Sequence, residues 1–207
     1  MAFELLTNEP VTPPACPPFI LTGAVSIKNH TNLTPPPATL AFGVNLPLSP
    51  PASAGVEGRT GGPTQVVLTF SEDIAADDES LDPGDEVTAN VGVIGSLAIS
   101  GNRLTVGLTG VPDMRCLVLT VENTPDGITT LGSEPLSGDN DVHVRVLKGD
   151  VNGSGSVNNF DILAVRGSLG QLVNAANFTK DVNLSGKIDN FDILQVRGAL
   201  GHIVACP

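Results

Sequence analysis

The stretch that decides the fold is "GDVNGSGSVNNFDILAVRGSLG", from Gly149 to Gly170. The chain repeats it almost unchanged as "KDVNLSGKIDNFDILQVRGALG", from Lys180 to Gly201. In both copies, oxygen-bearing side chains recur at alternate positions, and a helix-like pattern follows them. Glycine stands at the sixth position of each loop, where a sharp turn favours a residue without a Cβ atom. The duplication therefore predicts two equivalent loop–helix units.

The spacing inside each loop is that of the EF-hand calcium loop. Ca²⁺ takes about six to eight oxygen ligands, which such a loop supplies from positions 1, 3, 5, 7, 9 and 12, with a backbone carbonyl at position 7. We therefore expect two Ca²⁺ ions, one in each loop. The candidate ligands are Asp150, Asn152, Ser154, the Ser156 carbonyl, Asn158 and Asp161 in the first loop, and Asp181, Asn183, Ser185, the Lys187 carbonyl, Asp189 and Asp192 in the second.

The two ligand sets differ in charge, because Asn158 of the first loop is replaced by Asp189 in the second. Fewer carboxylates generally weaken calcium binding, so we predict that the second site is the tighter one. A purely structural role is the alternative interpretation, in which the ions only fold a unit too small to be stable without them.

Each unit departs from a complete EF-hand. Both loops end in Asp rather than Glu, and the strand-like segment "VHVRVLKG" precedes the first loop instead of a helix. The apolar residue at position 8 of each loop is expected to tie the two loops together in a short β contact. Each following helix should end near a C′ glycine, Gly170 or Gly201, and the two helices should pack on each other. Their expected apolar stripes are Ile162, Val165 and Leu169, and Ile193, Val196 and Leu200.

This combination resembles the dockerin domain, in its type I-like form, over residues 149–207. The resemblance implies a non-catalytic calcium module that anchors an extracellular or cell-surface protein to a cohesin-like partner. The module could instead dock on its own β domain, or identical chains could assemble through it. The family's partner-binding positions map to Asn159, Phe160, Arg166 and Gly167, and to Asn190, Phe191, Arg197 and Gly198. The repeated phenylalanine is either an exposed anchor or a core residue, and we favour the core.

Before the repeats, residues 18–147 alternate between apolar and polar residues in short segments separated by Pro, Gly and Asp. This pattern predicts an antiparallel Ig-like β-sandwich, with a barrel as the alternative. Segments such as "GVEGRTGG" and "VVLTFSEDI" also resemble an Ig-like module that precedes dockerin-like tails in secreted bacterial proteins. The expected fold class is thus multi-domain β + α, with a proline-rich extended lead-in at 1–17, the sandwich at 18–147 and the dockerin-like module at 148–207.

Composition restricts the partners and the compartment. The net charge of −12 disfavours nucleic acid, and no apolar stretch is long enough to span a membrane. The first residues of the printed chain lack the features of a signal peptide. Cys16, Cys116 and Cys206 allow at most one internal disulfide, whose pairing stays open, and they favour an oxidising compartment. The acidic segment 71–86 is interpreted as a solvated loop.

No catalytic arrangement is recognisable, so we predict that the chain is not an enzyme and has no small-molecule substrate. His30, His143 and His202 are scattered, and no phosphate-binding loop is present. A carbohydrate-binding module is disfavoured because the chain has no Trp and no Tyr. A self-assembling surface-layer or fibre subunit, with purely structural calcium loops, is the remaining alternative.

Overall fold

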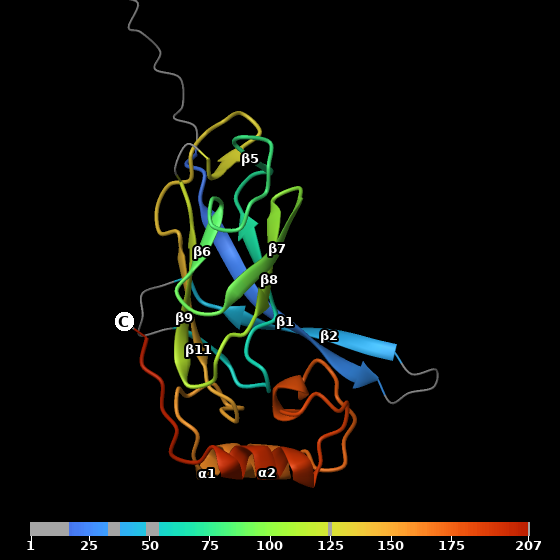
Figure 1. The fold of residues 1–207 in the computed structure, drawn as a ribbon. Coiled ribbons are helices and arrows are strands. Elements are labelled where there is room, and N and C mark those ends of the chain that lie inside the picture. The colour runs from blue at the N-terminus through green and yellow to red at the C-terminus, as the bar shows by residue number, and fades with distance from the viewer. Residues whose placement is uncertain (1–16, 33–37, 49–53, 124–125, 207) are drawn as a thin grey trace, which may run out of the picture.

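The computed structural model describes residues 17–32, 38–48, 54–123 and 126–206 of the 207 in the chain. The predicted lead-in, including Cys16, lies almost wholly outside these residues. Two β-sheets face each other, and the helices lie at one end of them (Figure 1). One sheet has the order β2-β1-β4-β8-β7, made of Leu21–Asn32 (β1), Ala38–Leu46 (β2), Gln65–Phe70 (β4), Val93–Ser100 (β7) and Arg103–Thr109 (β8). The other has the order β3-β11-β9-β6, made of Gly55–Glu57 (β3), Val87–Ala89 (β6), Arg115–Val121 (β9) and Asp141–Val146 (β11).

Strict alternation of apolar residues produces the core between the two sheets. In β8, the side chains of Leu104, Val106 and Leu108 point inward and are buried. The equivalent residues of β9 and β11 meet them from the opposite sheet. The inward residues of those two strands are Leu117, Leu119, Val121, Val142, Val144 and Val146. The predicted β-rich fold with two layers is therefore confirmed.

The three-residue strands and one strand pairing were not predicted from the sequence. β3 pairs with β11 in parallel, whereas the other strand pairs of the described residues are antiparallel. A third, two-stranded sheet pairs Ile74–Ala76 (β5) with Ile128–Thr130 (β10). β5 lies inside the acidic segment 71–86, and Glu86 at its end is buried. The other seven acidic residues of the segment are exposed, so the interpretation of 71–86 as a solvated loop holds for most of it and fails at β5 and Glu86.

Two helices and one 3-10 turn follow the sandwich: Asn159–Arg166 (α1), Phe178–Lys180 (η2) and Asn190–Gly198 (α2). Ile162, Val165, Ile193 and Val196 are buried in a second apolar cluster, as the helical periodicity predicted. The predicted stripe was wrong at its third member, because Leu169 and Leu200 are exposed. Both follow the end of their helix, in turns that lead to Gly170 and Gly201, which have φ values of 83° and 85°.

The expected β contact between the two loops was also wrong. The position-8 residue of each loop pairs instead with the segment that follows the helix of the other repeat. Val157 accepts a hydrogen bond from Gly201 N (2.9 Å) and donates one to the His202 carbonyl (2.9 Å). Ile188 likewise pairs with Gly170 and Gln171. The repeats are therefore interlocked crosswise, and each loop depends on the end of the other unit.

The module is joined to the sandwich covalently and by a shared core. A disulfide links Cys116 of β9 to Cys206 near the C-terminus, which resolves the pairing that the sequence left open. The second apolar cluster also contains Val56 of β3 and Leu147, the residue after β11. The packing of the module therefore includes side chains that precede the expected boundary at residue 148.

Candidate functional site: two calcium loops and an exposed helical face

The first loop brings the predicted ligands of positions 1, 3, 5 and 7 close together. Ser154 N donates to both Asp150 Oδ1 and Asn152 Oδ1, at 3.0 Å each. The Ser154 hydroxyl lies 3.0 Å from the Ser156 carbonyl oxygen, to which it donates. Gly155, with φ of 82°, directs its N–H to Asp150 Oδ2 at 2.6 Å. The loop therefore brings oxygen atoms of four residues around one point.

The second loop repeats this geometry. Ser185 N donates to Asp181 Oδ1 and to Asn183 Oδ1, both at 2.9 Å. The Ser185 hydroxyl lies 3.4 Å from Asp181 Oδ1 and 3.0 Å from the Lys187 carbonyl. Gly186, at φ of 86°, donates its N–H to Asp181 Oδ2 at 2.8 Å. Oxygen atoms from positions 1, 3, 5 and 7 thus converge here as well.

The ligands predicted at positions 9 and 12 also form the start of each helix. Asn158 and Asp189 are the N-cap residues of α1 and α2, and Asp161 and Asp192 complete a capping box at N3. Asp161 Oδ1 also accepts from Val151 N at 3.1 Å, so the last predicted ligand binds back to the beginning of the loop. This hydrogen bond across the loop brings the last predicted ligand next to the first ones.

The electrostatics of these carboxyl groups favour a cation. Burial raises the pKa of Asp150, and burial raises the pKa of Asp192 to about 6. Nearby carboxylates add to both shifts, Asp161 in the first case and Asp181 and Asp189 in the second. A cation among these oxygens would offset the repulsion and the lost hydration, and hard carboxylate, hydroxyl and carbonyl oxygens are the donors that Ca²⁺ prefers. The residues present therefore fit calcium, although their ligation stays a prediction.

The remaining predicted residues form an exposed face on the two helices. Phe160 and Phe191 are 72% and 67% exposed, so our interpretation of this pair as core residues was wrong. Each is the second residue of its helix, whose buried side is occupied by the isoleucine and valine stripe. Leu163 and Leu194 extend this face and are exposed too. The structure places the other predicted contacts, Asn159, Arg166, Gly167, Asn190, Arg197 and Gly198, at exposed positions as well.

These observations define the C-terminal part as a duplicated loop–helix module of the calcium-binding class. Residues 148–201 match the family model described as the dockerin type I domain. The chain therefore carries a C-terminal dockerin domain, which confirms the resemblance found in its sequence. Dockerin domains bind calcium and are non-catalytic docking modules. No curated protein and no solved structure matched the chain.

The sandwich contributes a buried polar network beside the module that the sequence did not reveal. Glu57 and Arg59 form an ion pair (2.7 Å), in which both side chains are almost fully buried. Ser26 donates its hydroxyl to Glu57, and Arg59 also donates to the Phe42 carbonyl. His30 lies between this pair and the second loop, with Nε2 3.3 Å from Arg59 Nη1. The only sequence signal was the unusual pair of charged residues in "GVEGRTGG", two residues apart in an apolar context.

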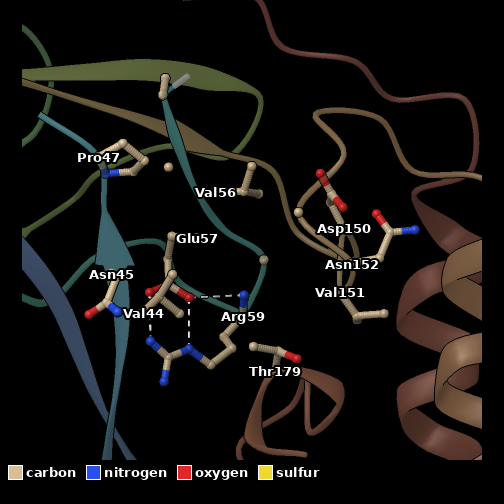
Figure 2. A pocket seen from close by; sticks show the side chains of 14 residues that line it. Val44, Asn45, Pro47, Val56, Glu57, Arg59, Asp150, Val151, Asn152 and Thr179 are labelled. Carbon is tan, nitrogen blue, oxygen red and sulfur yellow. Dashed lines mark hydrogen bonds and ion pairs between the residues drawn. The ribbon is translucent and has the colours of Figure 1, made fainter. Parts of the chain in front are cut away.

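The sandwich packs differently against the two calcium loops. Around the second loop, Phe178 of η2 stacks on Phe42 of β2, with ring centroids 5.3 Å apart, and Arg59 lies over the same Phe178 ring. Beside the first loop, a pocket lies between part of the sandwich and the loop, although Gly58 directly contacts the Asp150 backbone. Figure 2 shows this pocket, with Glu57 and Arg59 on one side and Asp150 and Asn152 on the other. The sandwich therefore contacts both loops, but its aromatic contacts lie beside the second.

Proposed function

We propose that this chain is a non-catalytic, extracellular docking protein whose dockerin domain, loaded with two Ca²⁺ ions, binds a cohesin-type partner. The observation that carries this proposal is the repeated exposed face, in which both helices present the same Phe, Leu and Arg side chains to solvent. Exposed aromatic and arginine side chains are the residue types that dominate protein–protein binding energy. No helix within the described residues is both long and apolar enough to cross a membrane.

The calcium loops support this role because they order the helices that form the exposed face. Asp161 and Asp192 cap the helices that carry Phe160 and Phe191, so a ligand that orders each loop also orders the helix start beside it. The other side of the module is occupied, because it packs on the chain's own β-sandwich. The exposed helical face is consequently what the module offers to another molecule, and the sandwich serves as its support.

Titration calorimetry against a panel of type I cohesins, with calcium and with chelator, tests this function. The double variant Phe160→Ser/Phe191→Ser should lose binding, whereas Leu131→Ser should keep it. Leu131 is a matched control, since it is equally exposed but lies beyond β10 on the sandwich. Binding that survives the double variant would contradict the proposal. Calcium-dependent self-association in place of cohesin binding, measured by light scattering, would support the alternative of an assembling subunit.

A further inference from the structure

A buried side chain of the sandwich contacts a predicted calcium ligand. His30 of β1 has no exposed surface, and its Nδ1 lies 2.8 Å from Asp181 Oδ2. Asp181 is itself fully buried and stands at position 1 of the second loop. The two residues are far apart in the sequence, which explains why neither the loop pattern nor its spacing revealed the contact.

The neighbours of His30 determine which way its proton points. Arg59 Nη1 lies 3.3 Å from His30 Nε2, and a guanidinium group can only donate hydrogen bonds. Nε2 is therefore the acceptor, and the ring carries its proton on Nδ1, from which it donates to Asp181. Glu57 fixes Arg59 in turn through bonds of 2.8 and 2.7 Å to Nε and Nη2. The donor aimed at the calcium loop is thus held by two successive buried contacts, that of Arg59 with His30 and that of Glu57 with Arg59.

In the first loop, the hydrogen bonds of the position-1 carboxylate within the described residues include no side chain of the sandwich. The two oxygens of Asp150 accept hydrogen bonds from Ser154 N and Gly155 N, which belong to the same loop. The sandwich meets this region through the backbone, where Gly149 N donates to the Gly58 carbonyl at 2.8 Å, and through the Arg145 side chain of β11, which lies beside Gly155. The second loop receives two backbone bonds of its own, from Thr31 N to the Leu184 carbonyl (3.1 Å) and from Thr60 N to the Val182 carbonyl (2.8 Å).

We propose that the β-sandwich completes the second calcium site, with His30 as the residue that positions the Asp181 carboxylate. Hydrogen-bond donors behind a metal ligand orient it, and their loss typically weakens metal binding by about 10–100-fold. Because linkage is reciprocal, calcium in the second loop must also strengthen the contact between that loop and the sandwich. This inference does not depend on whether the helical face binds a cohesin-type partner.

The two position-6 glycines allow each site to be followed separately in the full-length protein. Gly155 N–H and Gly186 N–H donate to the position-1 carboxylates of the first and second loops, respectively. Their amide signals in ¹H–¹⁵N spectra therefore report on calcium binding at each loop during one titration. The first loop thus serves as the internal control for the folding of every variant.

Two substitutions of His30 separate its hydrogen bond from its packing. His30→Phe keeps a ring beside Phe42 and Phe178 but removes the donor, whereas His30→Asn keeps a donor near the Nδ1 position and removes the ring. We expect His30→Phe to raise the calcium midpoint of Gly186 by about tenfold or more, and that of Gly155 by less than about twofold. His30→Asn should restore most of the affinity. Equal shifts at both glycines, or a larger loss in His30→Asn than in His30→Phe, would overturn the proposal.

A measurement on the unaltered protein tests the same coupling without any substitution. Calcium should slow the hydrogen exchange of the Thr31 and Thr60 amides, which bond to the second loop, more than that of Thr105 in β8, which pairs with Val67 inside the sandwich. If the three amides respond alike, calcium does not act through this contact, and the proposal fails.

Discussion

Gly153 and Leu184 occupy the same position in the two loops, and both have left-handed backbone conformations, with φ of 74° and 64°. This conformation is sterically easy for glycine but costs about 1–2 kcal/mol for a residue with a Cβ atom. The Leu184 carbonyl accepts the Thr31 N–H of the sandwich. The second loop therefore keeps an unfavourable backbone conformation at a point where β1 holds it in place.

Gly153→Ala isolates this backbone cost in the first loop. A Cβ atom at Gly153 would meet nothing within 4 Å, so the substitution adds no clash. We expect it to lower the free energy of unfolding by about 1 kcal/mol, as measured by chemical denaturation in calcium. Gly198→Ala is the matched control, because it also has free space but lies at the end of α2. It should raise stability by up to about 1 kcal/mol, and a loss at both positions would contradict the explanation.

Substitutions on the two sides of α1 should differ greatly in their effect on stability. Ile162 belongs to the second apolar cluster, so Ile162→Ala should cost about 2–5 kcal/mol through lost packing and the resulting cavity. Phe160→Ser, on the exposed side, should change stability by no more than about 0.5 kcal/mol. Thermal denaturation followed by circular dichroism compares the two. A strongly destabilised Phe160→Ser variant would show that this phenylalanine is packed rather than exposed.

The disulfide should contribute strongly to stability, because its cysteines are 90 residues apart in sequence. Closing a long loop restricts the unfolded chain, and native disulfides typically contribute about 2–4 kcal/mol. The double variant Cys116→Ser/Cys206→Ser should therefore unfold at a clearly lower denaturant concentration than the oxidised protein. Reduced wild-type protein provides the control, since it should behave like the double variant. Equal stability of oxidised and reduced protein would contradict this prediction.

Calcium affinity should differ between the two loops. The second loop has three predicted carboxylate ligands and the first has two, so the second should bind more tightly. In a calcium titration of the wild-type protein, the Gly186 amide should therefore reach its midpoint before the Gly155 amide. A calorimetric comparison offers an independent check, in which Asp192→Ala should reduce affinity more than Asp161→Ala. The reverse order would show that ligand charge does not set the ranking.

Local periodicity accounts for the parts of the structure that the sequence predicted. The alternation of apolar and polar residues within 18–147 predicted short strands such as β4 and β11, and the duplicated loops predicted the positions of α1 and α2. Both patterns involve residues that are close in sequence. In a strand, alternate side chains face the same core, and in a loop, alternate side chains face the same ion. The three-residue strands, including β3, are too short to show any period.

The remaining features depend on contacts between distant segments. The exposure of Phe160 and Phe191 could not be read from their apolar character, because the position of a helix against its neighbours decides which side is covered. The crosswise pairing of Val157 and Ile188, and the contact of His30 with Asp181, likewise require the folded arrangement. Sequence reasoning identified the candidate ligands but not the residue that supports one of them.

The Cys116–Cys206 bond also determines how a pulling force would travel through the molecule. The module leaves the sandwich through the backbone at Leu147 and returns to it through this disulfide. A load applied to the exposed helical face therefore reaches the sandwich along two covalent routes, at β11 and at β9. The module is consequently attached at two points, and it should resist mechanical separation from the sandwich better than a domain connected by a single linker.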